Sequence, residues 1–276
     1  MEKTLTQSTP KKRPLNAKTV AAFTDFHDGF SNWRLWTTLA WQDIKLRYRR
    51  STLGPFWLTI SMFVIIYALG LIYGSLFKTD LRKYFPHIAT GMIFWNFISV
   101  TIMEMVDTFV ENGHTIKQTR LPYTVYSLRI YTRNCIILAH HLIALIPILI
   151  YFKMVVNVPL ALISFLLASI CIFSYGTLLG FLGARYRDIK PIIQNVLQLI
   201  FYVTPIMWMA EQLPEKYTFI TIWNPMHHIL NILRAPFIYT STPSFSFLAA
   251  SLIACVGFLL MCLIFIKSRH RIPFWI

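Results

Sequence analysis

The sequence is short of charged residues, and of acidic residues above all. Charged side chains make up 13% of the 276 residues and hydrophobic ones 56%, whereas a soluble domain carries about 25% charged residues. The mean hydropathy of +0.55 points the same way. This composition argues against a soluble enzyme, a disordered chain and a secreted disulfide scaffold, and it favours a polytopic membrane protein.

The shortage of acidic residues leaves a large positive charge. Only 11 aspartates and glutamates face 26 lysines and arginines, so the net charge is +15. In a soluble chain such an excess would suggest a nucleic-acid partner. In a membrane protein it is typical of cytoplasmic loops next to anionic lipids, so we expect membrane lipids and no nucleic acid as partners.

Cysteine and histidine patterns for metal binding are also missing. The cysteines are few, none forms a CxxC pair, and all fall inside apolar stretches: Cys135, Cys171, Cys255 and Cys262. Adjacent histidines, as in the pairs at 140–141 and 227–228, point about 100° apart on a helix. We therefore predict no metal site and no redox site.

Nucleotide-binding and hydrolase motifs are absent too. The chain has no G-x-x-x-x-G-K-[ST], no H-E-x-x-H, no G-x-S-x-G and no G-x-G-x-x-G, so we expect no bound cofactor and no catalytic residue. Glu104 and Asp107, three apart on one helix face, are the one carboxylate pair that could serve a membrane enzyme. The simpler interpretation is ion pairing with Arg120, Arg129 or Arg133.

Long charge-poor runs are what the sequence does have. They predict an all-α polytopic membrane protein, since helices satisfy their own backbone in lipid. Small residues four apart, at Gly70/Gly74 and Gly176/Gly180, permit close helix packing. The six predicted spans are 55–77, 86–108, 134–152, 159–184, 192–210 and 246–266.

The distribution of lysine and arginine predicts the orientation. The segments 1–54, 111–134, 184–191 and 267–276 hold 20 of these residues, and the opposite segments hold 6. Cytoplasmic loops carry the excess, so we predict both termini in the cytoplasm. The polar, basic start lacks an apolar core for a cleavable signal. We expect residues 1–30 to be a basic cytoplasmic tail and the first span to direct insertion.

Two segments differ from the spans. Residues 31–50 place Trp33, Trp36, Ala40 and Ile44 at helical spacing beside basic residues, which predicts an amphipathic helix in the membrane interface. Residues 211–240 are apolar but broken by prolines. Irregular backbone at membrane depth must be covered by protein or water, so short re-entrant helices are expected there before the last span.

Motifs at the membrane borders carry a resemblance. They are RYRRSTLGPFW at 47–57, TRLPYTVY at 119–126, ARYRDIKPIIQ at 184–194, VTPIMW at 203–208 and WNP at 223–225, followed by Arg234 and a closing RIPFWI. In this order they resemble the permease subunits of ABC-2 exporters of lipid-linked polysaccharide. The resemblance covers about 33–276, so residues 31–276 are treated as one ABC-2 transmembrane domain.

The resemblance implies partners and a location. Such permeases move O-antigen, capsule or teichoic-acid polymers across the bacterial inner (cytoplasmic) membrane, as homodimers with two copies of a separate ABC ATPase subunit. ATP and Mg would then sit on that subunit. The alternatives are an ABC-2 permease for another lipid or drug cargo, and a membrane glycosyl- or acyltransferase.

Three groups of site residues are expected on this basis. The ATPase contact is predicted at Asp43, Arg47, Tyr48, Arg49, Thr115, Lys117 and Arg120. The pyrophosphate of the lipid carrier is predicted to meet Arg185, Arg187 and Lys190 at the cytoplasmic mouth. An outer gate is predicted at Trp208, Glu211, Trp223, Asn224, Pro225 and Arg234, with Glu211 or Glu215 as the partner of Arg234.

Overall fold

The computed structural model describes residues 15–238 and 242–276, and within them it is all-helical. The α-helices are α1 Leu15–Ser31, α2 Trp33–Arg47, α3 Phe56–Leu76, α4 Leu81–Val106, α5 Thr108–Glu111, α6 Gly113–Gln118, α7 Tyr123–Ile143, α8 Ile146–Tyr151, α9 Val158–Arg185, α10 Ile189–Val203, α11 Phe219–Ile222, α12 Pro225–Ile238, α13 Ser244–Ser268 and α14 Ile272–Trp275. Short 3-10 turns are η1 Ala210–Gln212, η2 Glu215–Tyr217 and η3 Arg269–Arg271. The predicted all-α class is confirmed.

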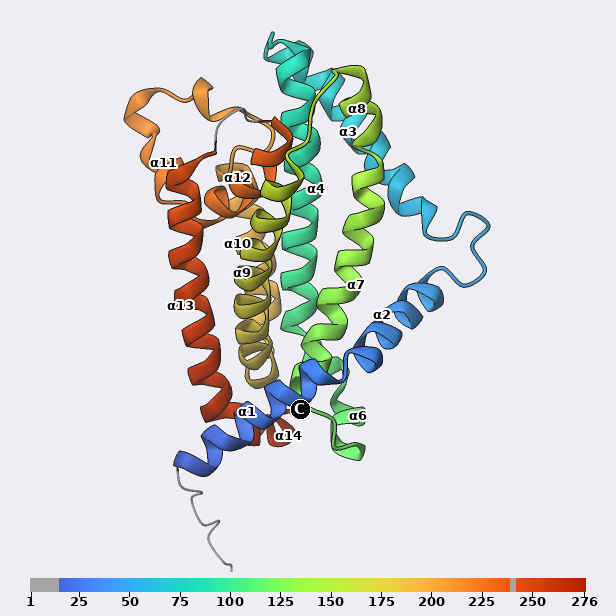
Figure 1. Ribbon diagram of the computed structural model, residues 1–276, viewed down its shortest axis with the longest axis vertical. Helices are drawn as coiled ribbons and strands as arrows, with labels where there is room; N and C mark the ends of the chain where they lie inside the picture. The colour runs from blue at the N-terminus through green and yellow to red at the C-terminus, as the bar shows by residue number, and fades with distance from the viewer. Residues whose placement is uncertain (1–14, 239–241) are drawn as a thin grey trace, which may run out of the picture.

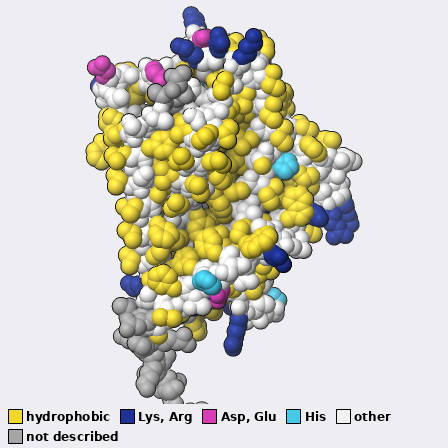
Figure 2. Space-filling view, viewed as in Figure 1, with side chains coloured by type: hydrophobic (Ala, Val, Ile, Leu, Met, Phe, Trp, Pro, Cys, Tyr) yellow, Lys and Arg dark blue, Asp and Glu magenta, His cyan; other side chains and the backbone are white. Residues whose placement is uncertain are grey.

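Five helical stretches are long and apolar enough to cross a membrane: Phe56–Leu76, Leu81–Val106, Tyr123–Tyr151, Val158–Arg185 and Ser244–Trp275. Helices α4, α7, α9 and α13 run along the bundle, whereas α3 slants outward from the α8 end to meet the loop after α2; α1, α6 and α14 lie at one end and α8 and α11 toward the other (Figure 1). Between the ends, hydrophobic side chains form a broad band, and most charged side chains lie beyond it (Figure 2). The chain is therefore a multi-pass membrane protein.

The predicted fifth span, 192–210, differs from the structure. Helix α10 has 15 residues and is about 22 Å long, which is shorter than the roughly 30 Å hydrocarbon layer. It ends because Pro205 disfavours a helical conformation at Thr204, whose ψ is 136°. Thr204–Met209 continues outward as irregular chain.

The third predicted span, 134–152, starts too late. Helix α7 begins at Tyr123 and includes Arg129 and Arg133, which the charge-free run left out. Both arginines are paired with carboxylates of neighbouring helices. That pairing allows charged residues to lie in the helix at the membrane border.

The predicted basic tail also differs. Residues 1–14 lie outside the described residues, but 15–31 form α1, which packs under α7 and α13. The Asp25 side chain is fully buried and accepts hydrogen bonds from the backbone N–H groups of Tyr123 and Thr124, both at 3.1 Å. Arg269 Nε lies 2.8 Å from the same carboxylate. Helix α1 is thus a packed element of the bundle, held against α7 and α13.

Helices α4 and α9 cross closely. Glycines of α9 face the last turns of α4, and a Cβ atom on Gly180 would lie 2.7 Å from the carbonyl oxygen of Met105. Backbone atoms cannot move away as a flexible side chain can. The predicted Gly176/Gly180 spacing therefore sits at a helix contact, as such spacing does in other membrane bundles.

This crossing yields a stability prediction. We expect Gly180→Val to destabilise the protein by about 1–3 kcal/mol, because the new side chain overpacks the contact. Thermal unfolding in detergent measures the loss. The control is Gly113→Ala, where a Cβ atom would meet nothing nearer than 3.6 Å; equal stability of the two variants would contradict the close crossing.

Candidate functional site

A network of ion pairs joins three helices toward the end of the bundle where α1 and α6 lie. Asp43 of α2 accepts hydrogen bonds from Arg129 Nε at 2.8 Å and from Arg133 Nη1 at 3.0 Å, both donors lying on α7. The other terminal nitrogen of Arg133 lies 2.8 Å from Glu104 of α4. Arg47 Nη2 donates to the same glutamate at 3.1 Å. We call Asp43, Arg47, Glu104, Arg129 and Arg133 the border network.

The residues predicted to contact the ATPase differ in exposure, and some of them belong to the border network. The Asp43 side chain is 11% exposed and is engaged within the chain, so the prediction that it contacts a partner is not supported by its placement. Arg49, Thr115, Lys117 and Arg120 are exposed. Tyr48 ends α2 and is half-buried, and burial raises the pKa of its phenol, which therefore stays neutral.

The two predicted contact elements meet at one side chain. Besides its pair with Asp43, Arg129 donates to the side-chain oxygen of Asn112 at 3.4 Å, and Asn112 immediately precedes α6. The end of α2 and the start of α6 therefore share an anchor. Whether the exposed residues Arg49, Thr115, Lys117 and Arg120 contact a partner stays a prediction.

The three cations predicted to receive pyrophosphate have different neighbours. Lys190 pairs with Asp107 at the end of α4. The Arg185 guanidinium lies 4.9 Å from the ring centroid of Tyr186 and 5.7 Å from that of Trp275. Arg187 is exposed. Their side chains are thus held by separate contacts, and the predicted joint anion site stays a prediction.

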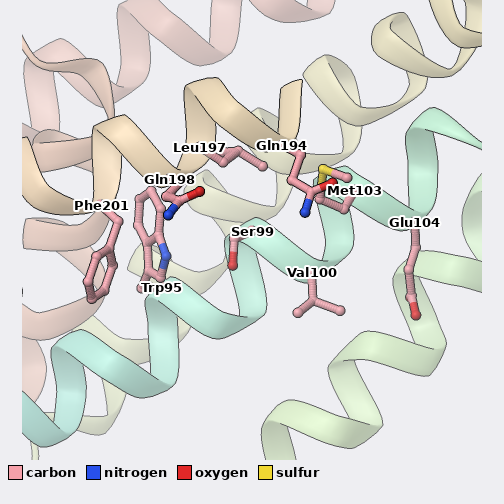
Figure 3. A pocket seen from close by; sticks show the side chains of 9 residues that line it. All are labelled: Trp95, Ser99, Val100, Met103, Glu104, Gln194, Leu197, Gln198 and Phe201. Atoms are coloured by element: carbon pink, nitrogen blue, oxygen red, sulfur yellow. The ribbon is translucent and has the colours of Figure 1, made fainter. Parts of the chain in front are cut away.

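A groove of about 370 Å³ lies between α4 and α10 (Figure 3). Its walls combine aromatic rings with polar side chains. In Figure 3 the side chains of Gln194 and Gln198 lie between α10 and α4, whereas Glu104, at one end of the row, points away from α10. The lining residues are Trp95, Ser99, Val100, Met103 and Glu104 of α4, and Gln194, Leu197, Gln198 and Phe201 of α10.

The amides of this groove were missed by the sequence reasoning. Gln194 and Gln198 are one turn apart on α10 and both are exposed, at a depth where most neighbouring side chains are apolar. An amide facing hydrocarbon is costly, so this face is suited to water, to a polar cargo or to another protein surface. The signal was present in the sequence as two polar residues four apart in an apolar helix.

At the opposite end of the bundle, side chains hold the VTPIMW segment by its carbonyl groups. Tyr84 Oη donates to the Met207 carbonyl at 2.6 Å, and His87 Nε2 lies 3.0 Å from the Trp208 carbonyl. Both Arg234 terminal nitrogens lie 3.1 Å from the Pro205 carbonyl. Side chains of α4 and α12 thus satisfy irregular backbone at membrane depth, as the hydrocarbon layer requires.

The predicted partner of Arg234 is wrong. Its side chain is 2% exposed inside the bundle, whereas Glu211 and Glu215 are exposed. Inside an apolar bundle a guanidinium needs several acceptors, and the Pro205 carbonyl supplies one to both terminal nitrogens. Gly91 makes room for it, because a Cβ there would lie 2.5 Å from Arg234 Nη2.

The remaining gate residues divide into anchors and an exposed tip. The Asn224 side chain donates to Thr204 Oγ1 at 2.9 Å and accepts from the Met226 backbone at 3.0 Å, so it caps α12, with Pro225 at the first helical position. Trp223 is 82% exposed at the end of α11. Trp208 donates to the Tyr202 carbonyl at 3.2 Å.

Comparison with known proteins agrees with this architecture. The family model for the ABC-2 type transporter matches residues 34–238. The chain is 25% identical over 244 residues to an O-antigen export system permease protein RfbA of Klebsiella pneumoniae, which covers 83% of this chain and 90% of that protein. A second RfbA from the same organism is 26% identical over 196 residues, or 67% and 73% of the two chains.

The matched region runs from the start of α2 to the end of α12. It includes the border network, both walls of the groove and the anchored outer segment. The chain therefore belongs to the ABC-2 type transporter family of membrane proteins.

Proposed function

We propose that this chain is the permease subunit of an ATP-driven exporter that moves lipid-linked polysaccharide across the bacterial cytoplasmic membrane. The observation that carries the proposal is the groove between α4 and α10. Aromatic faces pack against sugar rings without demanding one hydroxyl pattern, and glutamine amides both donate and accept hydrogen bonds. The similarity to O-antigen export permeases supports the same cargo.

The groove is open on one side, so a single chain forms only part of a conduit. We propose that a second copy completes it, with the amide faces of the two α10 helices lining a shared path. A closed two-fold dimer presents the same surface from each copy. Two copies of a separate ATPase would bind the exposed surface around Arg49 and Arg120 and supply ATP hydrolysis.

A membrane transferase is the less favoured function. It would need free carboxylates at the interface, but Glu104 is held by Arg133 and Asp107 by Lys190. Both carboxylates thus form ion pairs, as the simpler interpretation of the sequence predicted, and Arg133 is one of the partners expected there. An ABC-2 permease for another lipid or a drug has the same fold, and cargo analysis separates the two.

Deletion of the gene tests the cargo. We expect surface polysaccharide to disappear and lipid-linked polymer to accumulate on the cytoplasmic side, because synthesis continues while export stops. Gel analysis of surface polymer and extraction of lipid-linked intermediates measure both. Normal surface polymer in the deletion strain would rule out this cargo.

The ATPase contact gives a mutational prediction. We expect Arg49→Glu combined with Arg120→Glu to prevent co-purification of the ATPase subunit. Both arginines are exposed, and reversing their charge would repel an acidic surface on the ATPase that is complementary to them. The protein should still insert, since neither side chain belongs to the border network. Arg82→Glu, at the opposite end, is the matched control; unchanged co-purification of the double variant would place the interface elsewhere.

A further inference from the structure

The border network connects three helices through one bridging side chain. Arg133 contacts Asp43 of α2 with one terminal nitrogen and Glu104 of α4 with the other, at 3.0 and 2.8 Å. Its own side chain is 14% exposed. The planar fork of arginine fixes both directions at once, which a lysine ammonium does not do.

The network lies between two surfaces that the proposed function uses. At one end, α2 leads directly into the exposed Arg49, and Arg129 ties the same site to Asn112 at the start of α6. At the other end, Glu104 is itself a lining residue of the groove (Figure 3). One turn further on, Asp107 pairs with Lys190 at the start of α10, the opposite wall.

The contacts give a continuous route across the cytoplasmic end. It passes from α2 through Arg133 of α7 to Glu104 of α4, and from Asp107 of α4 to Lys190 of α10. Asn134 donates a further hydrogen bond to Glu104 at 2.6 Å, which fixes the carboxylate. A displacement of α2 must therefore either break a partly buried charge-assisted bond or move both walls of the groove.

Stability alone does not explain such an arrangement. Partly buried ion pairs lose much of their attraction to desolvation, and apolar residues of similar size often stabilise as well. Directional ion pairs do fix how neighbouring helices sit relative to one another. The network is therefore better suited to positioning than to holding the bundle together.

We propose that the border network transmits movement of α2 and α6, driven by the ATPase, to the groove, with Arg133 and Glu104 as positioning residues. This proposal rests on the proposed function. Arg133 holds α2 and α4 in a fixed relative position. Because Glu104 lines the groove, a movement of α2 then shifts α4 at the cytoplasmic mouth of the groove. Loss of either contact leaves hydrolysis running while less polymer is exported per ATP.

The test compares hydrolysis and export in the same complex. Arg133→Lys keeps the charge but lacks the planar fork that holds both carboxylates in fixed directions, and Glu104→Gln keeps the shape but loses the charge. For each we expect normal co-purification of the ATPase subunit and near-normal ATP hydrolysis, while polymer exported per ATP falls about tenfold, within the range of coupling between sites. A purely structural role would lower protein level, hydrolysis and export together.

Arg269→Lys is the matched control. It alters an arginine–aspartate pair of comparable burial at the same end, but it touches neither α2 nor α4, so its export per ATP should stay at the wild-type value. An equal loss in Arg269→Lys, or unchanged export per ATP in both network variants, would overturn the proposal. So would failure of both network variants to accumulate in the membrane while Arg269→Lys accumulates, because the network would then serve folding.

The wild-type complex separates this proposal from the proposed function. If the wild-type complex exports no polysaccharide, the cargo assignment fails. If the wild-type complex exports polymer and the network variants export the same amount of polymer per ATP, only the transmission role fails.

Discussion

Gln198→Trp is expected to reduce polysaccharide export to the level of a strain that lacks the protein. Gln198 is an exposed residue of α10 on the wall of the groove (Figure 3). An indole at this position would occupy the space between α4 and α10 and remove an amide that can bond to sugar hydroxyls. Because the side chain already faces open space, the bundle need not repack.

The neighbouring Leu199→Trp is the control for this prediction. Leu199 is 65% exposed on the same helix but is not among the residues lining the groove. It should export normally, since an outward tryptophan suits the surroundings of a membrane protein. Surface polymer is measured in a deletion strain carrying each variant at equal membrane level. Normal export by Gln198→Trp would mean that the polymer follows another path.

The second large effect concerns the end of the bundle where α11 lies. In a protein whose four native cysteines are replaced, Trp223→Cys is expected to cross-link two copies and to stop export until a reductant is added. Trp223 projects from the end of α11, whereas the residues on both sides of it are anchored: the Ile222 carbonyl lies 2.8 Å from His228 Nε2, and the Asn224 side chain donates to Thr204. A disulfide between copies would therefore tie two fixed bodies together across the exit.

The cross-link also distinguishes a moving gate from a fixed cap. A disulfide forms only when the two Cα atoms approach within about 7 Å, so Ile222→Cys is tested in parallel as a neighbouring site. Complete cross-linking with continued export would show that this segment is a fixed cap. The reductant reverses the covalent link, which makes each sample its own control.

The helical architecture could be predicted because lipid leaves the backbone little choice. Charge-poor runs gave the positions of α3, α4, α9 and α13 to within a few residues. The prediction of helix bounds failed where a helix contains charged residues. Arg129 and Arg133 lie inside α7, and no scan of single residues shows that Asp43, 86 and 90 positions earlier, neutralises them.

The same limit applies to the site residues. Sequence position suggested Asp43 as a partner contact and Glu211 or Glu215 as the counter-ion of Arg234. The fold instead turns Asp43 toward α7 and brings the Pro205 carbonyl to Arg234. The partners of Asp43 and Arg234 both lie 29 or more positions away in the sequence. Residues that are close in sequence therefore do not identify them.

The groove shows what the sequence did contain. Gln194 and Gln198 are spaced as one face of a helix, but the apolar length of the run was read as a span and the amides were passed over. These amides line a groove only because Trp95 and Ser99 of α4 lie opposite them. That arrangement follows from the packing of α4 against α10, which the sequence alone does not show.

Water and cargo access to the groove can be measured directly. In the cysteine-free protein, Gln194→Cys is labelled with a membrane-permeant maleimide, which reacts with cysteines that water reaches, in cells that make the polysaccharide and in cells that do not, with Leu199→Cys as the control facing outward. If the groove carries the polymer, the cysteine at 194 is labelled in cells without polymer and protected in cells that export it, while the cysteine at 199 shows no such dependence. Equal labelling at position 194 in both kinds of cell would contradict the assignment of the groove as the polysaccharide path.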